Sequence, residues 1–96
     1  MARFAVFRER GPAWDHSRGL EEQARWDDHA AFMDGLADEG LIVLGGPLGD
    51  GRETLLIFDA EAEAAILERL EPDPWTGMDM LRVSRIEPWQ VRLGGA

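Results

Sequence analysis

The sequence predicts one α+β domain in which strands and helices follow each other in the order β-α-β-β-α-β. Two stretches, residues 25–40 and 60–70, repeat their apolar side chains with the period of an amphipathic helix. Shorter apolar runs, bounded by glycine, proline or charged residues, have the length of strands. A chain of 96 residues has room for a single small core, so residues 1–96 are expected to form one domain.

The strand assignments follow from apolar runs and the breakers between them. The first strand is expected at residues 3–8, with apolar side chains on both faces, and residues 9–19 contain too many breakers to form a regular element. Residues 41–44 form a continuous apolar run that is typical of a strand buried on both faces. Residues 54–58 resume the strand pattern, so the glycine-rich residues 45–51 predict a hairpin turn.

The longest helical pattern, at residues 25–40, places a histidine on its apolar face. His29 shares one stripe with Phe32 and Leu36, and Gly40 is expected to close the helix in the left-handed conformation. An imidazole on an apolar face needs either a hydrogen-bond partner or a role in chemistry. His29 is therefore the first candidate for a functional residue.

The second helical pattern, at residues 60–70, follows Asp59, a residue type that can cap a helix. Two prolines within residues 71–77 are expected to end this helix, because proline cannot continue one. The last main strand is predicted at residues 80–86. In the tail, residues 89–93 alternate between apolar and polar, which predicts one more short strand.

This order of elements is the ferredoxin-like split motif, an antiparallel sheet of four strands with both helices on one face. All four predicted strands have apolar residues at consecutive positions, which is costly on a sheet face that is open to water. We therefore expect a second copy of the chain to cover that face, giving a homodimer of the dimeric α+β barrel type. The alternative is a monomer with an apolar sheet face.

Composition excludes several classes of function. The chain has no cysteine, which excludes disulfide scaffolds, thiol catalysis and cysteine-bound metal centres. Ten arginines against nineteen acidic residues give a net charge of −9, which repels nucleic acid and anionic membranes. No apolar run approaches the roughly 20 residues that span a bilayer, and no signal-peptide pattern is present. We expect a cytoplasmic protein without nucleic-acid or membrane partners.

Chain direction brings three segments to one end of the predicted sheet. They are the helix start with His29, the glycine-rich turn with Gly46 and Pro47, and the segment from Asp73 to Trp75. A histidine beside an aspartate, with a glycine turn that offers backbone N–H groups, is typical of a small acid–base or binding site. The sequence therefore predicts a pocket that is lined by these residues.

The same residues resemble a known family. The motifs, in order, are the helix with His29, Gly45-Gly46-Pro47-Leu48, Asp73-Pro74-Trp75 and Glu87-Pro88-Trp89. Together they resemble the YciI-like (YCII-related) family over almost the whole chain. The resemblance implies an enzyme with a ferredoxin-like fold, a dimeric α+β barrel and a His–Asp pair as active site. Separately, the lack of lysine, asparagine and tyrosine beside abundant alanine, glycine, arginine and aspartate indicates a bacterial source. By position His29 matches the family's histidine and Asp73 its aspartate, with Asp28 as the second choice.

From these residues we expect a small enzyme that needs no cofactor or metal and moves a proton on a small metabolite, as an isomerase or lyase does. His29 would be the general acid or base and Asp73 would orient it, while Gly46, Pro47, Trp75 and Asp28 would bind the substrate. The alternative function is a non-catalytic dimeric module that binds a small ligand in the same pocket.

Two structural interpretations and one weaker functional one stay open beside these. His29 can be a structural histidine that is hydrogen-bonded to Asp73, and a tryptophan such as Trp75 is more often a packing residue than a ligand contact. A metal site built from Asp15, His16 and residues 27–29 is a weaker hypothesis, because the two histidines lack a recognised ligand spacing.

Overall fold

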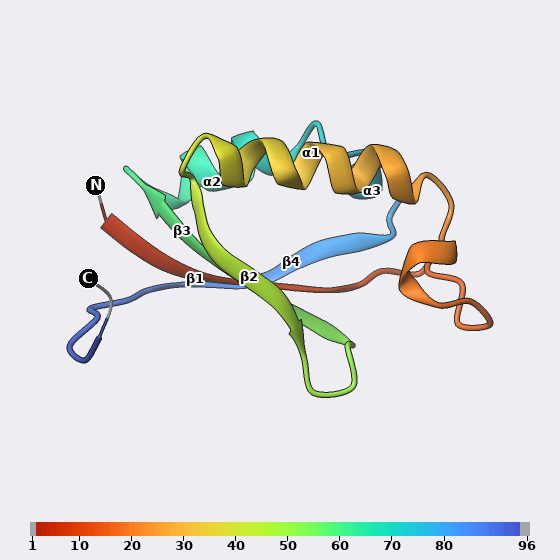
Figure 1. Cartoon of the computed structure of the whole chain (residues 1–96), viewed down its shortest axis with the longest axis horizontal. Coiled ribbons are helices and arrows are strands. Elements are labelled where there is room, and N and C mark those ends of the chain that lie inside the picture. The colour runs from red at the N-terminus through yellow and green to blue at the C-terminus, as the bar shows by residue number, and fades with distance from the viewer. Residues whose placement is uncertain (1, 95–96) are drawn as a thin grey trace.

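The computed structural model of the protein describes residues 2–94 and shows a four-stranded antiparallel sheet with its helices on one face (Figure 1). The strands are β1 (Ala2–Arg10), β2 (Ile42–Leu48), β3 (Glu53–Ala60) and β4 (Leu81–Pro88). The helices are α1 (Trp26–Asp38), α2 (Glu63–Leu70) and the single turn α3 (Pro74–Gly77), and a 3-10 turn, η1 (Leu20–Glu22), precedes α1. The predicted ferredoxin-like fold is confirmed.

The strands lie in the order β2-β3-β1-β4. β1 pairs antiparallel with β3 on one side and with β4 on the other, and β2 pairs antiparallel with β3 at the sheet edge. These directions bring the end of β1, the start of α1, the β2–β3 turn and the end of α2 to the same end of the sheet, as predicted (Figure 1).

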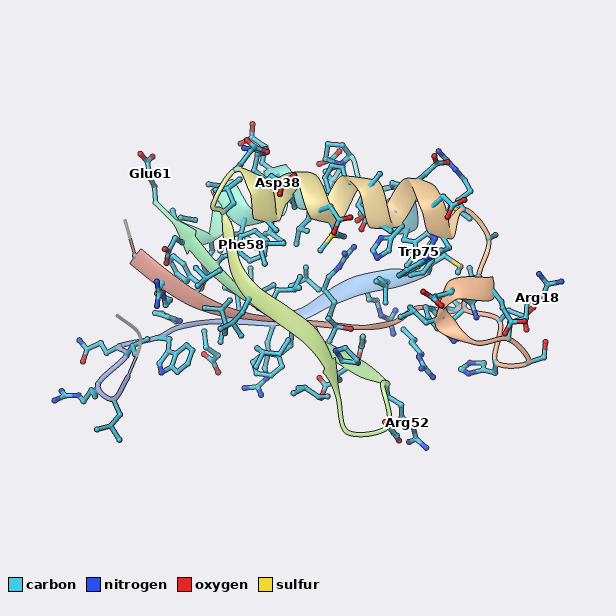
Figure 2. All side chains as sticks on the ribbon, in the orientation of Figure 1. Arg18, Asp38, Arg52, Phe58, Glu61 and Trp75 are labelled. Atoms are coloured by element: carbon cyan, nitrogen blue, oxygen red, sulfur yellow. The ribbon has the colours of Figure 1, made fainter. Side chains whose placement is uncertain are left out.

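The main core lies between the sheet and the helices. Phe4 and Val6 of β1 are two residues apart, so both point to the helix side. They pack with Leu36 of α1, Phe58 of β3 and Ile66 of α2, and all five side chains are buried. Figure 2 shows Phe58 between the sheet and the helices. Burial of this apolar surface is the main force that holds the helices on the sheet.

A second buried cluster holds the long loop after β1 against the start of β4. Trp14 of this loop meets Trp75 of α3 edge to face, with ring centres 5.6 Å apart. The Gly11 amide donates a hydrogen bond to the Met80 carbonyl at 2.9 Å. These contacts fix the position of Trp14, which becomes important for the cavity described below.

The second helix begins later than predicted. α2 starts at Glu63, and its N-cap, Ala62, makes no side-chain hydrogen bond. Asp59 lies in β3 instead, where its carboxylate pairs with the Arg3 guanidinium at 2.8 Å. The predicted Asp59 cap is therefore wrong, because the strand pairing with β1 continues to Ala60.

The glycine-rich segment is mostly strand rather than turn. Residues 45–48, predicted as turn, continue β2, and the turn itself covers only residues 49–52. Pro47 is tolerated because β2 is an edge strand, where a missing N–H need not break the ladder. A Cβ atom at Gly45 would lie 2.7 Å from Cδ2 of Leu56, so glycine permits the close approach of β2 to β3.

Two predictions about apolar segments are wrong. Ile42 is buried under the helices, but Val43 and Leu44 are 43% and 63% exposed, because β2 lies at an edge and no helix covers the outer face of the sheet. The tail at residues 89–93 forms no strand, and Leu93 is 91% exposed. In both places an apolar pattern lacks a partner surface within the chain.

We predict that Gly11→Ala destabilises the protein, because an added Cβ would lie 2.1 Å from the Asp79 carbonyl oxygen, a backbone atom. The expected loss in the free energy of unfolding is about 1–3 kcal/mol. Gly35→Ala is the matched control, since a Cβ at this position in α1 meets nothing within 4 Å. It should stabilise by about 0.5–1 kcal/mol. Urea unfolding measures both, and equal midpoints for the two variants would contradict the prediction.

Candidate active site

The structure brings His29 and Asp73 together. Nδ1 of His29 lies 2.9 Å from Oδ1 and 3.0 Å from Oδ2 of Asp73. Both residues are buried, with exposed fractions of 8% for His29 and 1% for Asp73. The contact that the sequence predicted is present, while the catalytic roles of the two residues stay a prediction.

Local sequence determines where the Asp73 carboxylate points. Asp73 is the N-cap of α3, and its Oδ1 accepts a hydrogen bond from the Trp75 amide at 3.0 Å. Pro74 occupies the start of α3, where its missing N–H is not needed and its restricted φ suits a helix. The prolines were expected only to end α2, but this one begins a new helical turn. The segment Asp73-Pro74-Trp75 thus orients the Asp73 carboxylate through contacts within a few residues of the chain.

Arg8 is the third member of the site, and the sequence analysis missed it. Its Nη1 donates to Oδ2 of Asp73 at 2.8 Å and its Nη2 donates to Oγ1 of Thr76 at 2.9 Å. Only 1% of its surface is exposed. The sequence did contain a feature that indicates a buried arginine, because Arg8 follows Phe4 and Val6 at a spacing of two and so shares their buried face. A charged residue in the buried phase of a strand needs a buried partner.

Asp73 is ionised although it is buried. Burial raises the pKa of this carboxyl, but hydrogen bonds from His29, Arg8 and the Trp75 amide together outweigh burial and hold its pKa below the usual 3.8. A carboxylate can only accept hydrogen bonds, so Nδ1 of His29 donates in their contact. In a neutral imidazole the other nitrogen, Nε2, is then the basic atom.

Aromatic side chains fix the plane of the His29 ring. The ring stacks on Trp75, with ring centres 3.8 Å apart and planes 7° from parallel. Trp75 is itself anchored, because its Nε1 donates to the Ala24 carbonyl at 2.7 Å. Trp26 packs against both rings with ring centres 5.9 Å apart. Figure 2 shows Trp75 beneath the first turns of α1. The imidazole therefore has little freedom to rotate.

A cavity of about 430 Å³ opens beside His29, a volume within the range of small-molecule sites. Four of the predicted residues line it, namely His29, Gly46, Pro47 and Trp75. Asp73 does not line it but contacts two side chains that do, His29 and Arg8. Further lining residues, which the sequence analysis did not assign to a pocket, include Arg8, Arg10, Trp14, Trp26, Met33 and Leu56. The cavity thus combines apolar and aromatic walls with a few polar groups.

Asp28 is not part of this cavity. Its carboxylate pairs with Arg25 at 3.0 Å, and its side chain is 61% exposed. Successive residues on a helix point about 100° apart, so the neighbour of a buried His29 faces solvent. Asp28 is therefore not the partner of His29, and its predicted place in the pocket is wrong.

The described residues show no metal cluster and no membrane span. Within residues 2–94, no group of three or more histidine and acidic side chains is placed to hold a metal ion. Asp15 pairs with Arg18 on the surface, and His16 is exposed nearby. Among the helices of this part of the chain, none is both long and apolar enough to cross a membrane.

Comparison with known proteins supports the fold. No protein-family model matches the chain, and no curated protein matches it. Among solved structures it is similar to 5-chloro-2-hydroxyhydroquinone dehydrochlorinase from Burkholderia phenoliruptrix AC1100, in complex with 2,5-dihydroxybenzoquinone, with a TM-score of 0.57 and 24% sequence identity. The match covers 96% of this chain and 95% of that chain. The likeness extends over the whole domain, and the YciI-like resemblance stays a prediction.

We predict that Asp73→Ala lowers the free energy of unfolding by about 3–5 kcal/mol, because it leaves the Arg8 charge buried without its partner. Asp28→Ala is the matched control and should leave the unfolding midpoint almost unchanged, since its ion pair is exposed. Urea unfolding followed by circular dichroism measures both variants. Similar midpoints for the two alanine variants would show that the buried carboxylate does not stabilise the fold.

Proposed function

We propose that the protein is a small enzyme that needs no cofactor and moves a proton on a ligand held in the cavity, with His29 as the acid–base group. The observation that supports this most strongly is that the two ring nitrogens of His29 have different surroundings. Nδ1 is bound to Asp73, while the ring lines the cavity and Nε2 has no hydrogen-bond partner within residues 2–94. A basic nitrogen at a cavity wall is what proton transfer requires.

Each residue of the site has a task in this mechanism. Nε2 of His29 takes a proton from the ligand, and the Asp73 carboxylate stabilises the imidazolium that forms. Arg8 holds Asp73 in its ionised state, so the carboxylate stabilises the positive ring without accepting its proton. Return of the proton to a different ligand atom is an isomerisation, and departure of a leaving group is a lyase reaction.

The cavity walls favour a planar ring as substrate. Trp26, which is partly exposed, lines the cavity beside the buried Trp14 and Trp75, and an exposed aromatic surface stacks well on a planar ring. The dehydrochlorinase that shares the fold is named for a chlorinated hydroxyhydroquinone, an oxygenated ring, and loss of hydrogen chloride removes one proton and one chloride ion. We propose an oxygenated cyclic substrate of this kind and, with it, membership of the YciI-like family.

A non-catalytic ligand-binding module is the second candidate, and the packing of His29 favours it. The ring is stacked on Trp75 and hydrogen-bonded to Asp73, which are the contacts of a structural histidine. The two candidates differ at one atom. Only the enzyme needs Nε2 to exchange a proton with the ligand.

We expect anaerobic incubation with 5-chloro-2-hydroxyhydroquinone to release chloride, and His29→Gln to lower that rate by about 100-fold or more. Glutamine keeps a donor for Asp73 but has no basic nitrogen, so the variant should stay folded and still bind 2,5-dihydroxybenzoquinone. His16→Gln, which changes the exposed histidine, is the control and should keep the full rate.

A wild-type rate in His29→Gln would contradict the proposed role of His29. Tight binding of the quinone by the wild type, without chloride release or deuterium exchange into any ring compound tested, would favour the binding module.

We also propose that the outer face of the sheet forms a homodimer. No helix covers this face (Figure 1), and Phe7, Leu55 and Ile57 line a shallow groove on it. Leu44, which is paired with Ile57, is 63% exposed. A second copy of the chain would cover this groove and bury the exposed surface of Leu44, and a two-fold interface is the commonest form of self-association.

The charges around this face support a second copy as the occupant. Three arginines of the face are paired with three carboxylates, in the ion pairs Arg3–Asp59, Arg82–Glu9 and Arg85–Glu87. The chain as a whole has a net charge of −9, so most of its surface would repel an identical copy. A face on which charges are largely matched is the one on which two copies approach with least repulsion.

We predict that light scattering gives a dimer of the 10.7 kDa chain and that Leu44→Asp converts it to a monomer, because a carboxylate would be buried without a partner. Leu67→Asp is the control, since Leu67 is 49% exposed on α2, on the opposite side of the sheet. It should remain a dimer. A monomeric wild type at micromolar concentration would refute the proposed interface.

A further inference from the structure

Arg10 places a cation on the wall of the cavity, and this cation has no carboxylate partner within residues 2–94. Eight of the ten arginines form ion pairs with carboxylates within residues 2–94. The other two are Arg92, which is exposed and contacts Gln90, and Arg10, which is half-buried. Nε of Arg10 is buried and has no hydrogen-bond partner among the described residues. Glu9 and Glu53 line a neighbouring pocket together with Arg10, but neither carboxylate forms an ion pair with it.

Two neighbours hold the Arg10 guanidinium in place. Its Cζ lies 4.6 Å from the ring centre of Trp14, in a cation–π contact. On the other side is the β2–β3 turn, where a Cβ atom at Gly51 would lie 3.1 Å from Nη2 of Arg10. Trp14, Gly51 and Arg10 all line the cavity that His29 lines. The guanidinium is thus positioned by packing and not by an ion pair within residues 2–94.

The charge of the cavity wall is not matched by the protein. Arg8 also lines the cavity, but its charge is paired with Asp73. The lining contains no aspartate and no glutamate, although the chain has nineteen acidic residues. A partly buried cation without a counter-charge is unfavourable unless a ligand supplies one.

We propose that Arg10 binds an anionic oxygen of a planar ligand, either a ring carboxylate or an ionised ring hydroxyl. A guanidinium presents parallel N–H groups that suit such oxygens, and stacking on Trp14 holds it ready for them. Combined with the proposed function, on which this last step rests, the substrate of His29 is an acidic ring compound. The binding role of Arg10 does not depend on that step.

The test compares benzoate with benzamide, which have nearly the same shape but differ in charge. Binding is followed by quenching of the cavity tryptophans and by the NMR signal of the Arg10 Nε–H group. Wild type should bind benzoate about tenfold or more tightly than benzamide, and Arg10→Gln should lose about tenfold or more in benzoate affinity. Arg10→Lys, which keeps the charge, should retain part of that affinity, and Arg92→Gln should behave as wild type.

The outcomes separate this inference from the proposed reaction. Equal affinities of the wild type for benzoate and benzamide, or unchanged benzoate affinity in Arg10→Gln, would overturn it. Binding of benzoate that persists in His29→Gln and fails in Arg10→Gln would support the anion site even if His29 proves not to be catalytic. Titration with 2,5-dihydroxybenzoquinone, whose ring hydroxyls are acidic, distinguishes a hydroxyl ligand from a carboxylate. Thermal melts check folding, and if Arg10→Gln unfolds, the comparison of benzoate with benzamide on the wild type still tests the proposal.

Discussion

One buried carboxylate connects three elements, β1, α1 and α3, at the cavity end of the molecule. Asp73, at the start of α3, accepts hydrogen bonds from Arg8 of β1, from His29 of α1 and from the Trp75 amide. An unpaired charge in the interior costs several kcal/mol, so each charged partner needs the other. The charges of Arg8 and Asp73 compensate each other, and both side chains are almost fully buried. Polar contacts therefore hold this end of the sheet against α1 and α3. The apolar core between Phe4, Val6 and the longer helices stabilises the rest.

The contacts that make His29 structural also prepare it for chemistry. Asp73 determines which ring nitrogen bears the proton, and Trp75 determines the plane of the ring. Asp73 acts at the Nδ1 edge and Trp75 on a face of the ring, and Nε2 has no protein partner among the described residues. A group held this rigidly does not need to reorganise when a ligand arrives, which is an advantage in proton transfer. The structural and catalytic interpretations of His29 are therefore compatible.

The distribution of charge distinguishes the cavity from the rest of the surface. The chain has a net charge of −9, yet the cavity wall contains Arg10, which has no carboxylate partner within residues 2–94, and Arg8, whose charge is paired with Asp73. At physiological salt, charges on the outer surface are screened within about 8 Å, whereas groups inside a partly closed cavity are screened less. An anionic ligand thus meets a locally positive wall in an acidic protein. Apolar and tryptophan side chains around these arginines strengthen the effect by excluding water.

The sequence by itself determined the fold and the end of the sheet at which the site forms, because helix and strand periods and chain direction are local properties. It also indicated His29 and Asp73, since a histidine on an apolar stripe needs a partner and chain direction places an aspartate nearby. Only the tertiary structure decided which side chains meet. Arg8 and Asp73 are 65 residues apart, and no local period shows that α3 brings a carboxylate to the buried face of β1. Asp28 was a candidate by proximity in the sequence but turns to solvent, and Leu44 is apolar yet exposed at an edge strand. Such choices depend on how complete elements pack against each other, which the spacing of residues within one element does not encode.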